Sequence, residues 1–358
     1  MTGTGNTETL AESGRPRVAR ASCLRPHGLE ACVTLGAAGP SAETAEGFPA
    51  GHGARGHEGR SRRLPAWLRV PFRGAAERGE VGRLLRRLEL NTVCEGAHCP
   101  NLCECWQRRT ATFMILGDRC TRQCRFCAVP TGQPAAVDPD EPARVAEAAE
   151  RLSLRHAVVT SVTRDDLADG GAGQFAAVID ALRRRCPAIA IEVLTPDFGG
   201  ASAALLTVLK AAPDVLNHNL ETSRRLSPAV RPQADYERSL ALLRAAACEA
   251  RVPMRVKSGF MLGMGETAPD VRELLADLRA AGVTVLTIGQ YLPPSAAHWP
   301  LDRYVPPDEF DEWGRIAREE YGFAAVASAP RVRSSYLADG LAAAAAAAGE
   351  LARRKMRG

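Results

Sequence analysis

Seven of the chain's 11 cysteines lie between Cys94 and Cys127. Six of these form two triplets, which we name the upstream triplet (Cys94, Cys99 and Cys105) and the downstream triplet (Cys120, Cys124 and Cys127). The downstream triplet has the spacing C-x3-C-x2-C, which lets three thiolates of one loop converge on one small inorganic cluster. An iron–sulfur cube takes four ligands, so three cysteines leave one iron open. An open coordination position is typical of a site that carries out chemistry.

The alternative interpretation of the downstream triplet is a structural zinc site. Zinc sites usually pair C-x2-4-C with a second pair further along the chain, which is not the spacing seen here. With Phe126 before its last cysteine, the downstream triplet instead resembles the signature of the radical S-adenosylmethionine superfamily. In that superfamily the amino and carboxylate groups of S-adenosylmethionine occupy the open iron, and the resemblance assigns Phe126 to the cofactor site.

The upstream triplet has the spacing C-x4-C-x5-C, which a generic member of this superfamily has no reason to carry. The two triplets together resemble the lipoyl synthase family. The resemblance extends from about Leu64 to about Leu341. Its further blocks are CPNLCECW and ATFMILG around the triplets, TSVTRDDLADGG at 160, EVLTPDF at 192, NHNLE at 217, VRPQADY at 230, KSGFMLGMGET at 257, GQYLPPS at 289 and RSSY at 333–336.

The resemblance implies two 4Fe–4S clusters, one catalytic and one auxiliary that donates sulfur. It assigns the downstream triplet to the catalytic cluster, and the upstream triplet with a serine of RSSY to the auxiliary cluster. By position this serine is Ser335, although the sequence does not separate it from Ser334. An oxygen ligand is hard where thiolate is soft, so the serine should be the ligand most easily displaced. A hydrogen-bonded turn is the structural alternative for such a serine.

Three further residues near these motifs need an interpretation. Asn219 and Glu221 lie at the end of a predicted strand, where polar side chains can reach the methionine or ribose part of S-adenosylmethionine. Either side chain could instead satisfy a neighbouring backbone group. Cys103 lies two residues before Cys105 and departs from the family pattern, so we interpret it as a bystander thiol.

The implied reaction is the insertion of two sulfur atoms at carbons 6 and 8 of an octanoyl group on a lysine of a carrier protein. These carbons are unactivated, so a cofactor must supply a radical. The implied partners are octanoylated lipoyl carrier domains or the glycine cleavage H protein, an electron donor such as flavodoxin or ferredoxin, and a cluster-repair carrier. Two alternatives are another radical enzyme with an auxiliary cluster, such as a methylthiotransferase, and a two-cluster electron-transfer protein that is not an enzyme.

Composition excludes several other classes of protein. The net charge is +5, but the basic residues are spread along the chain rather than gathered with interleaved aromatics, so we expect no nucleic-acid partner. No run approaches 18 apolar residues without a charge, so we expect no membrane span. Clustered cysteines in an enzyme-sized chain without an apolar signal peptide favour a reducing compartment, the cytoplasm.

Apolar strands and amphipathic helices alternate after the cysteines. The strand candidates are FMIL, AVVTSV, AIEVL, VLNHNL, MRVKSGFML and VTVLTIGQ. Six strand-then-helix units predict an α/β fold, a partial (β/α)6 TIM-type barrel with N-terminal and C-terminal extensions. In such a fold the carboxyl ends of the strands line the site. A doubly wound open sheet is the main alternative, but no G-x-G-x-x-G follows the first strand.

The predicted helices have apolar faces and end signals. One face contains Val145, Ala148, Ala149 and Leu152, spaced i, i+3, i+4 and i+7. Asp140 precedes Glu141 and Pro142, which predicts a helix start with a side-chain cap. Gly282 is predicted to end a later helix.

The chain divides into four expected segments. Residues 1–60 are rich in Gly, Ala, Pro, Thr and Arg without sustained periodicity, and we expect a disordered tail. Residues 61–117 form an N-terminal extension with the auxiliary-cluster ligands and the first barrel strand. Residues 118–329 form the partial barrel. Residues 330–358 form a C-terminal segment with RSSY and a helical tail.

Overall fold

The computed structural model describes residues 64–69, 75–96, 99, 101–107, 112–249, 254–335, 338 and 340–341, without the side chains of residues 75–78, 103 and 107. The tail expected over residues 1–60 lies outside the described residues. Residues 342–358 of the expected helical tail lie outside them as well.

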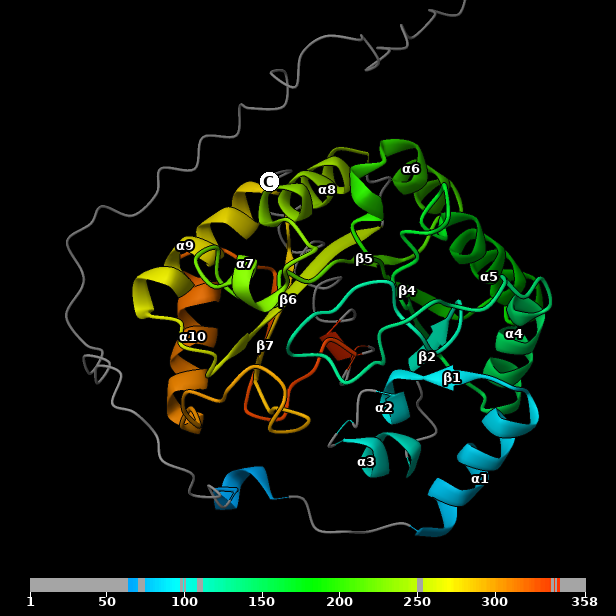
Figure 1. Ribbon diagram of the computed structural model, residues 1–358, viewed down its shortest axis with the longest axis horizontal. Helices are drawn as coiled ribbons and strands as arrows, with labels where there is room; N and C mark the ends of the chain where they lie inside the picture. Colours follow the sequence, from blue (N-terminus) through cyan, green and yellow to red (C-terminus); the bar gives the residue numbers. More distant parts are fainter. Residues whose placement is uncertain are drawn as a thin grey trace, which may run out of the picture. The chain divides into compact units, whose positions relative to one another are not determined.

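An eight-stranded sheet forms the centre of the described chain, and its strands follow one another in sequence order (Figure 1). The strands are β1 (Asn91–Thr92), β2 (Thr112–Ile115), β3 (His156–Ser161), β4 (Ala190–Leu194), β5 (Val215–Asn217), β6 (Arg255–Leu262), β7 (Val285–Gln290) and β8 (Ala325–Ser328). Strands β2–β8 are parallel, and β1 runs antiparallel to β2. The sheet curves but does not close, since β1 and β8 are its edges in the described part. The expected partial barrel is confirmed, with its six predicted strands as β2–β7.

The two edge strands were not expected from the sequence. Strand β1 has only two residues. Strand β8 reads AVAS, and alanine is depleted in strands, so neither segment has a strand pattern of its own. Pairing with the neighbouring strand stabilises each of them, as in the register of β8 with β7 from Val285↔Ala325 to Ile288↔Ser328.

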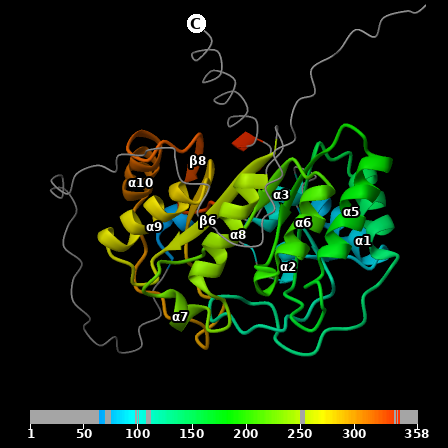
Figure 2. The same cartoon turned by 90° about the horizontal axis from the view of Figure 1, so that it is seen from above.

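Helices cover the convex face of the sheet (Figures 1 and 2). They are α4 (Glu141–Arg151), α5 (Ala172–Arg185), α6 (Ser202–Lys210), α8 (Tyr236–Glu249), α9 (Ala268–Ala280) and α10 (Pro307–Glu319). Other helices precede or connect these units: α1 (Ala75–Arg87), α2 (Val93–Gly96), α3 (Leu102–Gln107), α7 (Ser227–Val230) and the 3-10 turns Ala66–Leu68 and Phe198–Gly200.

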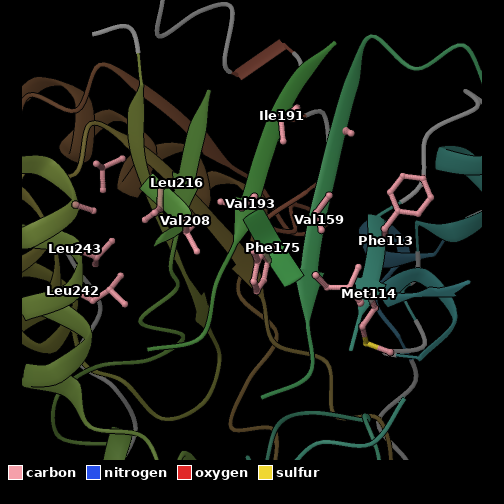
Figure 3. Close-up of a cluster of buried hydrophobic side chains, with 14 of the residues drawn as sticks. Phe113, Met114, Val159, Phe175, Ile191, Val193, Val208, Leu216, Leu242 and Leu243 are labelled. Atoms are coloured by element: carbon pink, nitrogen blue, oxygen red, sulfur yellow. The ribbon is translucent and has the colours of Figure 1, made fainter. Parts of the chain in front are cut away.

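Alternate residues of the strands pack against these helices. Phe113, Val159, Val193 and Leu216 come from four neighbouring strands and share one buried core with Phe175 of α5 (Figure 3). Burial of one such side chain stabilises the fold by about 1.5–3 kcal/mol. The face predicted for α4 is also buried, which confirms the helical period.

One of the two predicted helix ends is correct in full. Gly282 follows α9 with a φ of 83°, a left-handed conformation that favours glycine. Helix α4 begins at Glu141 as expected, but the predicted side-chain cap is wrong. Asp140 itself has helical backbone angles and caps no N–H with its side chain, whereas Asp138 accepts a hydrogen bond from the Asp140 N–H (2.9 Å).

The concave face of the sheet is polar. Strand residues alternate between the two faces, so the partners of the apolar positions point inward. These inward positions include the buried side chains of His156, Thr160, Glu192, Asn217 and Lys257. Such side chains need partners, because an unpaired buried polar group is costly.

A C-terminal segment, the described residues between 329 and 341, follows β8 and runs along this concave face. The Pro330 carbonyl accepts a hydrogen bond from the Gln290 N–H at the carboxyl end of β7 (3.3 Å). The Ser334 carbonyl accepts one from Lys257 Nζ (2.6 Å). Leu341 packs against the first residues of β7 and β8. The segment therefore passes from the carboxyl edge of the sheet to its amino edge, and Figure 1 shows it in red within the ring of strands.

We expect Gly289→Ala to lower the free energy of unfolding by about 1–3 kcal/mol. A Cβ at Gly289 would lie 2.2 Å from the Val332 carbonyl oxygen, so the C-terminal segment would have to shift. The measurement is urea denaturation. Gly340→Ala is the matched control, since a Cβ there meets nothing within 4 Å, and it should change the value by less than about 1 kcal/mol. Equal stability of the two variants would contradict this seating of the segment.

Candidate active site

The downstream triplet lies on the loop after β2, at the carboxyl edge of the sheet. The Cys120 N–H donates to the Pro130 carbonyl (2.9 Å), and the Gly132 N–H donates to the Cys120 carbonyl (3.0 Å). The Thr121 N–H donates to the Thr163 carbonyl beyond β3 (3.1 Å). The loop is therefore closed on itself and fixed to the neighbouring strand end.

The thiols of this loop fit a metal cluster better than a free nucleophile. Cys120 Sγ accepts hydrogen bonds from the N–H groups of Arg122 (3.4 Å) and Thr163 (3.3 Å), and such bonds tune cluster sulfurs. Burial, together with neighbouring thiols, raises the pKa of Cys124 and raises that of Cys127 to about 12. Thiols with a raised pKa are protonated at neutral pH, so they need a bound metal to become thiolates.

A network of ion pairs fixes the loop of the downstream triplet to the neighbouring loops. Arg122 donates to Asp197 Oδ1 (2.6 Å) and to both oxygens of Asp165 (2.7 and 2.8 Å). Arg238 donates to the other oxygen of Asp197 (2.8 Å). Burial opposes ionisation of Asp197, but the two arginines outweigh it and hold its pKa well below the usual range. Asp197 lies in the TPDF block and Asp165 in the TSVTRDDLADGG block, which are the sequence signals for this network, and no role was predicted for Arg122.

Asn219 and Glu221, the predicted cofactor-contact residues, lie just beyond β5. Asn219 Nδ2 donates to Glu221 Oε1 (3.0 Å) and to Ser334 Oγ (2.5 Å), whereas Asn219 Oδ1 is buried without a partner in the described part. Glu221 has a left-handed φ of 66°. Hydrogen bonds with the backbone of Gly259 (3.1 Å) and Met261 (2.9 Å) hold it there. Strain of this kind is found at functional sites.

Arg231 joins these residues to the downstream triplet, and sequence reasoning missed it. Its Nη1 donates to the Leu220 carbonyl (2.9 Å), and its Nε is buried without a partner among the described residues. Burial raises the pKa of Glu221, and Arg231 partly offsets this. Both Arg231 and Glu221 act electrostatically on Cys124. The block VRPQADY, which contains Arg231, was the only sequence signal for this arginine.

Phe126 lies in a second, smaller apolar cluster at the same edge of the sheet. It packs with Leu226, Val230, Met264 and Tyr291. This cluster supports the loop that carries the downstream triplet. The structure therefore brings Phe126 next to the triplet and shows its apolar contacts with protein.

Trp299 packs over the same loop. The Arg125 guanidinium lies 4.8 Å from the centre of the Trp299 ring. The backbone N–H of Trp299 donates to the Arg125 carbonyl (2.7 Å). The preceding residue, His298, places Nε2 3.1 Å from the Cys127 carbonyl. This segment therefore covers the loop from outside.

The upstream triplet lies on and between α2 and α3, beside β1 and β2. The Cys99 N–H donates to the Cys94 carbonyl (3.1 Å), and the Cys105 N–H donates to the Asn101 carbonyl (2.9 Å). Burial raises the pKa of Cys99. It also raises the pKa of Cys94 to about 11, although Trp106 partly offsets the effect of burial on Cys94. These thiols thus also fit a metal cluster. The side chain of Cys103, our expected bystander, lies outside the described part.

The C-terminal segment contacts residues that lie between the cysteines of the upstream triplet. Asn101 Nδ2 donates to the Arg331 carbonyl (2.7 Å), and Glu104 pairs with the Arg331 side chain (3.6 Å). Arg333 acts on the Cys99 thiol and lowers its pKa against the effect of burial. Helices α2 and α3 therefore contact both β1–β2 and the chain beyond β8, the two edges of the open barrel.

The two serines of RSSY have different surroundings. The Ser334 hydroxyl accepts from Asn219 Nδ2, and its carbonyl accepts from Lys257 Nζ. The Ser335 side chain has no hydrogen bond to another residue in the described part of the chain. The contacts of Ser334 therefore distinguish the two serines, which the sequence alone did not.

The side chains of the described residues do not form a ready-made site for a single metal ion. No three His, Cys, Asp or Glu side chains there are grouped so that they could hold one. None of the described helices is long and apolar enough to cross a membrane.

The open parallel barrel and the three-cysteine loop at its carboxyl edge define a radical S-adenosylmethionine enzyme. The family model "Radical SAM superfamily" matches residues 114–292. The X-ray structure of the FeFe-hydrogenase maturase HydG from Carboxydothermus hydrogenoformans has the same fold, with a TM-score of 0.51 and 12% identity over 69% of this chain and 65% of that chain.

Curated relatives identify one family within this class of enzyme. Lipoyl synthase of Methylococcus capsulatus is 57% identical over 78% of this chain and 87% of its own length. Lipoyl synthase of Pyrobaculum arsenaticum is 56% identical over 78% of this chain and 94% of its own length. The chain belongs to the lipoyl synthase family, and it is a sulfur-inserting enzyme that uses S-adenosylmethionine and 4Fe–4S clusters.

Proposed function

We propose that the downstream triplet holds the catalytic cluster of this lipoyl synthase, and that the upstream triplet with Ser335 holds a second cluster that provides the inserted sulfur. The position of the C-terminal segment carries this proposal. Its Arg331 contacts Asn101 and Glu104, which lie between two cysteines of the upstream triplet, and its Ser334 contacts Asn219 at the carboxyl edge of the sheet, where the downstream triplet lies. Two cysteine sites that face one polar interior suit a substrate chain held between them.

When bound, the clusters and S-adenosylmethionine supply a radical able to take hydrogen from carbons 6 and 8 of an octanoyl chain, and sulfide to replace it. The protein binds, orients and excludes water. Asn219 Oδ1 and Arg231 Nε are buried without partners in the described part, so they can bind the charged groups of S-adenosylmethionine together with Glu221. Phe126 contributes an apolar wall. Burial of these side chains keeps stray hydrogen donors away.

Enzymes of this family act on lipoyl carrier proteins. For this chain we propose octanoylated lipoyl domains or the glycine cleavage H protein as substrate. We also propose flavodoxin or ferredoxin as electron donor and a carrier that rebuilds the second cluster. We also propose a cytoplasmic location, because clustered thiols that bind iron–sulfur clusters suit a reducing compartment.

Product analysis tests this function. Anaerobically reconstituted protein should hold about eight irons per chain, four for each cluster. With an octanoyl-lysine carrier it should form the lipoyl group and two molecules of 5′-deoxyadenosine per product, since each carbon needs one hydrogen abstraction. A methylthio product would favour the methylthiotransferase alternative. Absence of 5′-deoxyadenosine would favour an electron-transfer protein.

A further inference from the structure

A buried ion pair lies at the middle of the concave face. Lys257 of β6 and Glu192 of β4 are each 1% exposed, and Lys257 Nζ donates to Glu192 Oε1 (2.7 Å). Asn217 Nδ2 of β5 donates to the same oxygen (3.2 Å), and His156 Nε2 of β3 lies 3.4 Å from Glu192 Oε2. Four neighbouring strands therefore fix the position of one ammonium group.

The second hydrogen bond of this ammonium goes to the C-terminal segment. Lys257 Nζ donates to the Ser334 carbonyl (2.6 Å). That carbonyl shares a planar peptide unit with the N–H of Ser335, so fixing its direction also fixes the position at which Ser335 begins. Asn219 holds the Ser334 hydroxyl at the same time. Ser334 is thus held at its carbonyl and at its hydroxyl.

This arrangement is more than the sheet itself requires. A buried ion pair gives little net stability compared with apolar residues of the same size, so the pair is weak evidence for a role in stability. Its attested use is to fix one arrangement among several. Here the arrangement that depends on it is the seating of RSSY beside the residues of the upstream triplet, where Asn101 Nδ2 donates to the Arg331 carbonyl (2.7 Å).

We propose that Lys257, oriented by Glu192, is the positioning residue that seats the C-terminal segment, with Ser334 as the anchor and Ser335 as the residue presented to the second cluster. The part that concerns Ser335 rests on its proposed role as a ligand. The anchoring of Ser334 does not depend on that role, so the two can fail separately.

The test uses Lys257→Met combined with Glu192→Gln in the full-length reconstituted protein. Lys257→Met alone would leave the Glu192 charge buried without a counter-ion, which can unfold the protein, and the second change avoids this. The control is Asp214→Asn, which weakens the pairing of Asp214 with Arg183 (2.7 Å) away from the C-terminal segment. Thermal unfolding confirms that both variants are folded.

The first readout is limited trypsin digestion, with cleavage after Arg331 and Arg333 followed by mass spectrometry. Loss of a charged hydrogen bond should accelerate this cleavage about tenfold or more in the double variant and leave it unchanged in the control. Equal cleavage rates in the wild type and the double variant would overturn the anchor.

The second readout is the electron paramagnetic resonance spectrum of the second cluster, recorded with the downstream triplet replaced by alanine. The double variant should alter this spectrum in the same way as Ser335→Ala, and Lys257→Arg with Glu192 intact should restore it. If Ser335→Ala alters the spectrum and the double variant does not, the positioning role is wrong. If Ser335→Ala leaves the spectrum unchanged, the ligand assignment fails, and the trypsin result alone decides the anchor.

Discussion

Alanine replacement of all three cysteines of the downstream triplet should halve the iron content of the reconstituted protein and abolish cleavage of S-adenosylmethionine. The reason is that Cys120, Cys124 and Cys127 are the thiols of one loop, closed on itself and fixed to the end of β3. No other described thiol lies on this loop, so nothing there replaces them. Iron and sulfide counts and the yield of 5′-deoxyadenosine provide the measurement.

Cys186→Ala is the matched control for this prediction. Cys186 follows α5, outside both triplets, and it is half-buried like the cysteines of the downstream triplet. Its replacement should leave both iron content and 5′-deoxyadenosine formation unchanged. A triple variant that still forms 5′-deoxyadenosine would show that the catalytic cluster is bound elsewhere.

Much of the fold could be predicted because the signals are local. Each strand of β2–β7 has an apolar stretch of its own, and each following helix has an apolar face with a period of 3.6 residues. The failures lie where contacts with other residues outweigh the local signal. Strand β8 has a composition poor in strand formers and depends on β7, while the side chain of Asp140 lost its expected capping role in a turn organised by Asp138.

The candidate site could be predicted only in part. The cysteine spacings are contiguous signals, so both triplets could be found in the sequence. Arg122 with Asp197, and Lys257 with Glu192, depend on which strands become neighbours and which side chains point inward. The difference between Ser334 and Ser335 depends in the same way on the path of the C-terminal segment across the concave face.

Alanine replacement of the upstream triplet should leave cleavage of S-adenosylmethionine intact and abolish sulfur insertion. Cleavage of S-adenosylmethionine should continue, because the residues of the downstream triplet lie on a different loop with its own hydrogen bonds. Formation of the lipoyl product should stop, because no cluster remains to provide sulfur. The measurement is a comparison of 5′-deoxyadenosine with lipoyl product in the same reaction, with Cys186→Ala again as the control. Lipoyl product from this variant would contradict the assignment of the upstream triplet.

The central claim is that the cluster of the upstream triplet is consumed as the sulfur source. Protein reconstituted with heavy sulfide, freed of excess sulfide and given one equivalent of octanoylated carrier tests this claim in a single turnover. The account predicts that the lipoyl group carries the heavy isotope at both sulfur positions. Unlabelled lipoyl product under these conditions would contradict it and would point to an external sulfur donor.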